Sequence, residues 1–330
     1  MGRAVSIGGF LASRHRLRPA EALPWLAAIA AYFLFPDYLQ LGAQVLIMIL
    51  FGLSLDLILG YAGIVSLGHA AFFGVGAYAA GILSAHGHWH EPVTGLIAGA
   101  AAGAVFGFVS GWVILRTRGL PLLMLTLAFT ILLQEIANQW QSVTGGDDGL
   151  QGITMDPIFG AFEFDIFGRT AYCYALLALF VVFVLARRIV NSPFGQSLRG
   201  IRENVRRMHA IGAPVHLRLV MIYTVAAAMA GVAGALLTQI TQFAALPTLS
   251  FEKSGDILII LILGGYGRLY GAFIGAPIYM VLQDQLAKAS PEYWLLGIGL
   301  MLIVVVLFAP RGLLGLCEDA VARWRRRVAR

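Results

Sequence analysis

The stretch Gly60–Tyr78, GYAGIVSLGHAAFFGVGAY, lies between two apolar runs and carries five glycines together with the polar residues Ser66 and His69. Peptide groups inside a bilayer must find hydrogen-bond partners, so an interrupted helix is tolerated only against protein or a wet cavity. Paired interruptions of this kind are typical of the substrate route of a transporter. Glycines alone also serve the close packing of helices, and the residue types leave both interpretations open.

The composition of the chain is that of a membrane protein. Its 330 residues are 59% hydrophobic and 12% charged, whereas a soluble domain carries about 25% charged residues. Several apolar runs approach the roughly 20 residues that cross a bilayer as a helix. The net charge of +6 comes from arginines gathered between these runs, which indicates positive-inside topology rather than nucleic-acid binding. The two cysteines, Cys173 and Cys317, are expected on opposite sides of the membrane and predict neither a disulfide nor a metal site.

We predict an all-α polytopic fold of about ten transmembrane helices, embedded in the lipid bilayer with both chain ends in the cytoplasm. This topology places every basic residue except Arg169, Lys253 and Lys288 on the inner side. A basic N-terminus (1–22) and a basic C-terminus (310–330) flank the transmembrane domain (23–309). The eighth span is short, so a re-entrant segment is an open alternative. The spans are expected near 23–36, 40–59, 64–85, 93–115, 119–140, 170–187, 217–241, 250–265, 270–287 and 292–309.

The fourth span repeats glycine every four residues, at Gly95, Gly99, Gly103, Gly107 and Gly111. This spacing puts a smooth strip along one face of a helix, which lets another helix approach closely. The strip therefore predicts a tight helix pair and carries no information about substrate.

The opening stretch closely resembles the signature of the permease subunits of bacterial branched-chain amino acid ABC transporters, in the LivM-like branch. The resemblance extends over roughly residues 46–316, and a second glycine-rich stretch at 264–276, GGYGRLYGAFIGA, resembles the other glycine-rich motif of that family. It implies a substrate pathway along the two interruptions. The expected pathway residues are Gly60, Gly63, Ser66, Gly68, His69, Gly264, Gly265 and Gly267.

Glu135 is a further candidate for the pathway, near the outer end of the fifth span. A carboxylate inside a membrane span is a functional candidate by default. Its position near the span end also allows the simpler interpretation that it reaches the lipid headgroups.

The predicted periplasmic loop, 141–169, contains the sequence TGGDDG. Thr144, Gly145, Gly146, Asp147 and Gly149 resemble the TGG-x-x-G loop of the LivM-like permeases. Glycines there permit turns with positive φ, and the acidic side chains suit a surface that meets a soluble binding protein. An ordinary Gly-Asp turn is the alternative.

The predicted cytoplasmic loop, 188–216, is rich in arginine and holds a single acid, Glu203. Residues 197–211 are expected to form one short helix that ends at Gly212. The arginines also serve to fix topology. By resemblance, this segment is the coupling helix that docks on the ATPase. The residues implied in coupling are Arg202, Glu203, Asn204, Arg206 and Gly212.

Weak sequence similarity between two parts of the chain predicts an internal repeat of two related halves. Ala71-Phe72, Gly74 and Tyr78 recur as Ala272-Phe273, Gly275 and Tyr279; Gly60-Tyr61-Ala62-Gly63 recurs loosely as Gly265-Tyr266-Gly267, and Arg118-Gly119-Leu120 as Arg311-Gly312-Leu313. Spans two to four would then match spans eight to ten. Chance matches among small residues are an alternative explanation.

The sequence lacks the motifs of an enzyme. It contains no G-x-x-x-x-G-K-[ST], H-E-x-x-H or G-x-S-x-G, so we expect no cofactor in this chain and ATP bound by partner subunits. His86, His88 and His90 alternate in a short loop, where a metal site is possible in principle but not expected. Asp56 is expected to cap the first interruption.

The resemblance implies an ABC importer permease that takes leucine, isoleucine or valine from a periplasmic binding protein into the cytoplasm. The expected partners in the inner membrane are a homologous LivH-like permease and two ATP-binding cassette subunits. Urea or short-chain amide permeases share the SLGH stretch and form one alternative. A stand-alone secondary transporter or channel is disfavoured because the span centres hold few ionisable residues, and a membrane enzyme lacks a catalytic cluster.

Overall fold

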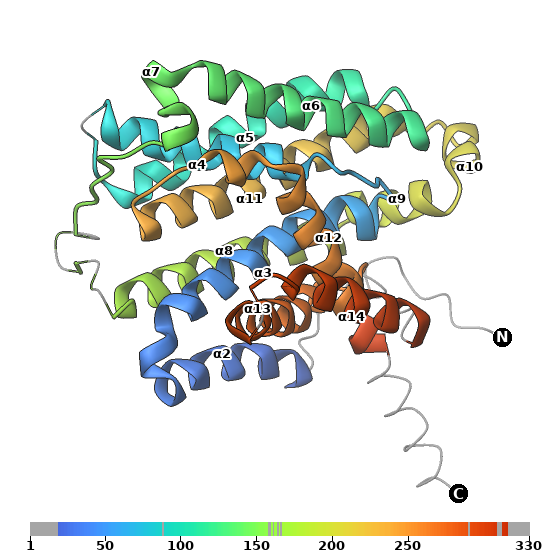
Figure 1. Cartoon of the computed structure of the whole chain (residues 1–330). Coiled ribbons are helices and arrows are strands. Elements are labelled where there is room, and N and C mark those ends of the chain that lie inside the picture. Colours follow the sequence, from blue (N-terminus) through green and yellow to red (C-terminus); the bar gives the residue numbers. More distant parts are fainter. Residues whose placement is uncertain are drawn as a thin grey trace, which may run out of the picture.

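The computed structural model describes residues 19–87, 89–157, 160, 162–163, 165, 167–289, 291–308 and 312–315. This part of the chain is helical and contains no β-strand, which confirms the predicted all-α class (Figure 1). The main helices are α2 (Leu23–Leu34), α3 (Leu39–Asp56), α4 (His69–Ala85), α5 (Pro92–Ile114), α6 (Leu120–Gln139), α8 (Arg169–Asn191), α9 (Pro193–Glu203), α10 (Val205–Ala210), α11 (Val215–Thr241), α12 (Phe251–Gly264), α13 (Gly271–Ala289) and α14 (Trp294–Phe308).

A helix occurs in each of the ten ranges predicted to cross the membrane. Five helical segments of the described part are long and apolar enough to span a bilayer: Pro36–Tyr61, Pro92–Ile114, Leu120–Gln139, Arg169–Asn191 and Val215–Thr241. The α12 helix has 14 residues, about 21 Å at 1.5 Å per residue, which is shorter than a hydrocarbon core of about 30 Å. The crossing of the other five helices, and a re-entrant eighth segment, therefore stay predictions.

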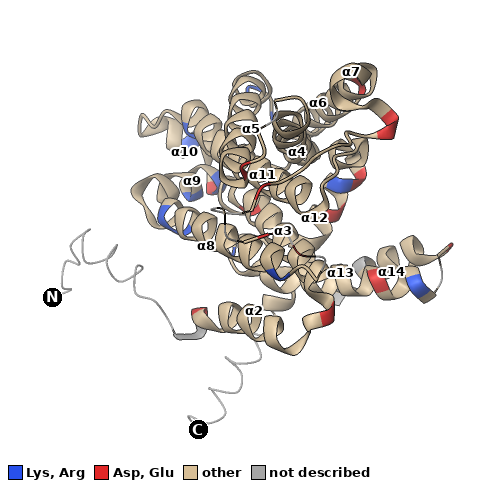
Figure 2. Ribbon diagram, turned by 90° about the vertical axis from the view of Figure 1, so that its left-hand side faces the viewer, with Lys and Arg blue, Asp and Glu red and all other residues tan. Residues whose placement is uncertain are grey.

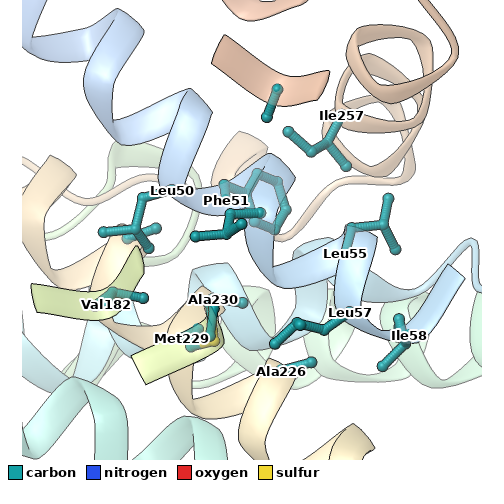
Figure 3. Close-up of a cluster of buried hydrophobic side chains, with 14 of the residues drawn as sticks. Leu50, Phe51, Leu55, Leu57, Ile58, Val182, Ala226, Met229, Ala230 and Ile257 are labelled. Carbon is teal, nitrogen blue, oxygen red and sulfur yellow. The ribbon is translucent and has the colours of Figure 1, made fainter. Parts of the chain in front are cut away.

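Helix α3 forms the centre of the core. It continues into a π-helical turn, Leu57–Tyr61. In the most apolar 18 residues of the segment Pro36–Tyr61, 78% are buried. Figure 3 shows Phe51 of α3 with Val182 from α8, Met229 from α11 and Ile257 from α12 around it, and all four belong to one buried hydrophobic cluster. The helix that leads into the first glycine-rich interruption is thus held on several sides by packing.

The glycine strip of α5 packs on α11, which confirms the predicted tight helix pair. A Cβ added to Gly99 would lie 2.7 Å from the Cβ of Ala235, and one added to Gly103 would overlap the carbonyl of Ala227. On the facing helix, Gly231 lies against Gly99 in the same way. Small residues on both helices thus allow backbone-to-backbone contact.

The two long loops lie at opposite ends of the bundle. The short helix α7 (Gln141–Thr144) is at one end, whereas α9 and α10 are at the other (Figure 1). In Figure 2, basic residues, drawn in blue, lie on and around α8, α9 and α10. A salt bridge of 2.7 Å joins Glu21, before α2, to Arg187 near the end of α8. This arrangement agrees with the predicted sorting of the loops, while the cytoplasmic location of either end stays a prediction, and most of segments 1–22 and 310–330 lies outside the described residues.

The arginine-rich insert differs from the single helix expected over 197–211. It forms two helices, α9 and α10, separated at Asn204, whose backbone is extended (φ −155°). The Asn204 side chain accepts a hydrogen bond of 3.0 Å from the backbone N–H of Arg207 and so caps α10. The prediction of one continuous helix was wrong because an asparagine that caps the second helix also ends the first. The predicted stop is confirmed, since α10 ends before Gly212, which has φ +76°.

Candidate functional site

The first glycine-rich stretch interrupts the helical path as the sequence predicts. The chain leaves the π turn after Tyr61 and becomes helical again at His69, the first residue of α4. Gly63 lies in the interruption with φ +74°, a conformation that costs little only for glycine. Val65 is 40% exposed. This segment, Ala62–Gly68, is called the first interruption below.

The second glycine-rich stretch makes an interruption of the same kind. It separates the end of α12 at Gly264 from the start of α13 at Gly271. Gly265 has φ +106° and Gly267 has φ +78°. This segment, Gly265–Tyr270, is the second interruption.

The π turn that leads into the first interruption meets the second interruption beside the end of α3. Gly60 lies so close to Gly267 that a Cβ added to Gly60 would be 2.6 Å from the Cα of Gly267. The backbone N–H of Gly267 donates a hydrogen bond of 2.5 Å to Oδ1 of Asp56, which is only 1% exposed. Asp56 was expected to cap the first interruption, and instead its carboxylate caps the second. It ties the two halves of the sequence together.

Helix α9 covers this contact from outside the bundle. Nη1 of Arg202 donates a hydrogen bond to the carbonyl oxygen of Gly60, and its guanidinium lies over the ring of Tyr266, 5.7 Å from the centroid. One turn earlier, the guanidinium of Arg199 lies 5.1 Å from the ring centroid of Tyr61. Each arginine therefore makes a cation–π contact with the tyrosine next to one interruption.

We call Asp56, Gly60, Gly267 and Arg202 the glycine junction. A pocket of about 370 Å³ opens beside it, lined by Gly60, Tyr61, Arg199, Arg202, Glu203 and Gly267. From the sequence, Gly60 and Gly267 are assigned to the substrate pathway, and Arg202 and Glu203 to ATPase coupling. The structure brings members of both groups into a single site.

The polar residues of the opening stretch lie elsewhere. His69 is fully buried, with Nε2 2.8 Å from the hydroxyl of Ser54 and its ring stacked on Phe51. Ser66 is also buried, and its hydroxyl accepts a hydrogen bond from the N–H of Gly68. Both side chains therefore stabilise the start of α4, and their place on a substrate route stays a prediction.

Glu135 is not brought to the glycine junction. It is exposed on α6, where its carboxylate accepts a hydrogen bond of 2.8 Å from Gln139. Together with Leu132, Ile136 and Trp140 these two residues line a shallow depression of about 360 Å³. This lateral position agrees with either a headgroup contact or a subunit contact, and a role in gating stays untested.

The loop after α6 forms the glycine turn that the sequence predicts. Gly145, Gly146 and Gly149 have φ values of +79°, +57° and +72°. The buried hydroxyl of Thr144 lies 2.5 Å from the carbonyl oxygen of Ala137, to which it donates, and it accepts from the N–H of Gly146. These contacts hold the turn rigidly and leave its acidic residues, Asp147 and Asp148, exposed.

The alternating histidines do not assemble in the described part of the chain. His90 lies within hydrogen-bond distance of Ser84 and Thr154, at 3.2 and 3.1 Å. His86 is exposed, and His88 lies outside the described residues. Among the residues that the structure describes, no three His, Cys, Asp or Glu side chains are grouped to hold a metal.

Residues 38–306 match the protein family described as the permease component of branched-chain amino acid transport systems. The chain belongs to this branched-chain amino acid permease family. It is 28% identical over 319 residues to the high-affinity branched-chain amino acid permease protein LivM of Escherichia coli, covering 89% of this chain and 73% of that protein. The permease protein LivH of the same organism is 24% identical over 284 residues, 81% of this chain and 90% of LivH.

The similarity reaches a sugar transporter as well. The fructose import permease protein FrcC of Rhizobium meliloti is 24% identical over 251 residues, 72% of this chain and 64% of FrcC. No solved structure matches the chain significantly. Membership of the permease family therefore identifies a transport protein and does not by itself identify the solute.

Sequence reasoning missed three residues of this permease site, Tyr61, Arg199 and Tyr266. A signal for them was present, because a Gly-Tyr pair stands in both glycine-rich stretches and two arginines stand three residues apart on α9. The proposed internal repeat stays a prediction. The matched glycines agree with it, since Gly63 and Gly267 have φ +74° and +78°, and Gly119 and Gly312 have φ +67° and +71°.

Proposed function

We propose that this chain is the membrane-spanning permease subunit of an ABC importer that carries leucine, isoleucine and valine into the cytoplasm. A periplasmic binding protein would deliver the amino acid, and a homologous second permease would form the other half of the passage. Two ATP-binding cassette subunits would bind and hydrolyse ATP, because this sequence has no P-loop. The protein would be an inner-membrane protein with both termini in the cytoplasm.

The observation that carries this proposal is the contact of α9 with both interruptions at the glycine junction. Through Arg202, a helix outside the apolar bundle touches the carbonyl of Gly60 just before the first interruption and Gly63 within it. The same arginine lies over Tyr266 of the second interruption. Movement of α9 by a docked motor would therefore reach both interruptions directly. An importer driven by separate ATPase subunits needs such a mechanical connection.

The chemistry of the interruptions suits a small zwitterion. Helices α4 and α13 begin directly after the two interruptions. Backbone N–H groups at the N-terminal ends of such helices attract a carboxylate. The apolar surroundings suit an aliphatic side chain, which supports a branched-chain amino acid over urea.

The first experiment compares solutes. The permease is reconstituted in liposomes with its second permease, ATPase subunits and binding protein, and uptake of labelled leucine is measured against labelled urea. We expect ATP-dependent leucine uptake that unlabelled isoleucine and valine inhibit. Uptake of urea alone would support the amide alternative, and uptake by the isolated chain without ATPase subunits would show a stand-alone transporter.

The second experiment tests coupling through the arginine-rich insert. Both Glu203 and Arg206 are exposed on it, so the double charge reversal Glu203→Arg and Arg206→Glu should not disturb the core. We expect uptake to be lost while membrane insertion is unchanged. The reversal Arg169→Glu, at an exposed position at the other end of the bundle, is the control. Normal uptake and ATPase coupling in the double variant would rule out this role of the insert.

The third experiment tests the pathway itself. Bulky replacements at Gly63, Gly68 and Gly267 together should abolish import, because Gly63 and Gly267 have positive φ and Gly68 lies against the backbone of Thr126. Protein amount in the membrane is measured in parallel. Unchanged import in the triple variant would show that the solute passes elsewhere.

A further inference from the structure

Arg202 is an exposed residue of α9, and its guanidinium lies against the glycine junction. Its aliphatic stem lies against Gly63, since a Cβ added to Gly63 would be 2.9 Å from Cγ of Arg202. Its Nη1 lies equally near the second interruption, 3.2 Å from a Cβ added to Gly267. The side chain thus occupies the space between two glycines with left-handed backbone, one from each interruption.

The carboxyl group of Asp56 lies at the same place. Its Oδ1 accepts the hydrogen bond from Gly267, and the backbone N–H of Arg268 also hydrogen-bonds this carboxyl group. Arg202 is close enough to interact electrostatically with this carboxylate. Because a buried charge is costly without compensation, the cation at position 202 also stabilises the cap on the second interruption.

We propose that Arg202 is a positioning residue that holds both interruptions in one conformation, so that displacement of α9 releases them together. This inference rests on the proposed function and deepens it, because it names the side chain through which the motor would act. When α9 moves, the bond to Gly60, the contact with Tyr266 and the compensation of Asp56 are all lost at once. Energetic coupling between two sites requires an element with two states that biases both sites. Here α9, through Arg202, would bias both interruptions toward one conformation.

The test uses the complete reconstituted transporter and compares Arg202→Gln with Arg207→Gln. Arg207 is an exposed arginine of α10, and it lines no part of the pocket beside the junction. We expect the number of solute molecules transported per ATP hydrolysed to fall about tenfold in Arg202→Gln, the factor expected for one charge-assisted hydrogen bond. Arg207→Gln should keep the parent ratio. Arg202→Lys, which retains the charge and a donor but not the planar fork, should be intermediate.

A purely structural role of Arg202 gives a different result. A folding defect lowers transport and ATP hydrolysis in proportion and leaves their ratio unchanged, and that outcome would overturn the inference. The ratio also separates this inference from the proposed substrate, because any solute that the complex carries can be used to measure it.

A second measurement follows the first interruption directly. Spin labels are placed at Val65 in the interruption and at Ala101, an exposed position on α5, in a background with Cys173→Ser and Cys317→Ser. Their distance distribution is recorded with and without a non-hydrolysable ATP analogue. We expect the analogue to shift the distribution in Arg207→Gln but not in Arg202→Gln. An equal shift in both, or no shift in either, contradicts the inference.

Discussion

Replacement of Gly60 by alanine tests the glycine junction most sharply. The added Cβ would lie 2.6 Å from Cα of Gly267 and would overlap the carboxylate of Asp56. Contacts of a Cβ are ordinarily 3.4 Å or longer, so the two backbones must separate by about 0.8 Å. The junction cannot keep its geometry with any side chain at this position.

The separation weakens two hydrogen bonds that cross the junction. One joins Gly267 to Asp56 and the other joins Arg202 to the carbonyl of Gly60. Each involves a charged group and is worth about 1.5–3 kcal/mol. Losing half of their combined energy, about 1.5–3 kcal/mol, lowers the population of the intact junction by roughly 12- to 140-fold at 1.4 kcal/mol per factor of ten.

The assay measures ATP-dependent leucine uptake together with the unfolding midpoint of the detergent-purified chain. We expect Gly60→Ala to reduce uptake more than tenfold and to lower the midpoint. Gly255→Ala on α12 is the matched control, since a Cβ there would meet nothing within 4 Å. That control should keep the parent values or gain slightly from helix propensity. Parent-like uptake and midpoint in Gly60→Ala would refute the reasoning.

Two further predictions concern other parts of the molecule. Gly103→Leu should drive α5 away from the carbonyl of Ala227 and destabilise the fold by about 1–3 kcal/mol, seen as a lower unfolding midpoint, whereas Ala101→Leu on the exposed face of the same helix should not. Equal midpoints would contradict the packing role of the glycine strip. Thr144→Val removes the buried hydroxyl that holds the glycine turn, so amide exchange in residues 145–150 should accelerate about tenfold or more. Unchanged exchange there, with an unchanged midpoint, would show that the backbone alone holds the turn.

Local features of the fold were predictable because their causes are local. Apolar runs of sufficient length become helices in a bilayer, and helices occur in all ten expected ranges. The four-residue spacing of glycine on α5 predicted that another helix packs closely on it, and the structure shows that this helix is α11. Glycine clusters predicted the two interruptions, and they predicted positive φ in the turn after Thr144.

Other features depended on contacts that no local pattern specifies. The end of α9 at Asn204 escaped prediction because an asparagine is compatible with a helix interior and with a cap, and the hydrogen bond to Arg207 selects the cap. The contact of Arg202 with Gly60 was not predicted either. An arginine in a basic loop is expected to face water or a partner, and only the position of Gly60 shows where this one binds.

The sequence by itself determined the class of protein, the positions of its helices, its family and the existence of two interruptions, since hydropathy and glycine spacing act over short stretches of chain. Tertiary structure alone decided that the π turn before the first interruption touches the second interruption and that α9 lies on both. Asp56 and Gly267 are 211 residues apart in the chain, and Gly60 and Arg202 are 142 residues apart. The contact forms because α3 packs in the core and thereby places the buried carboxyl group of Asp56 close to Gly60, whose backbone is accessible because it has no side chain.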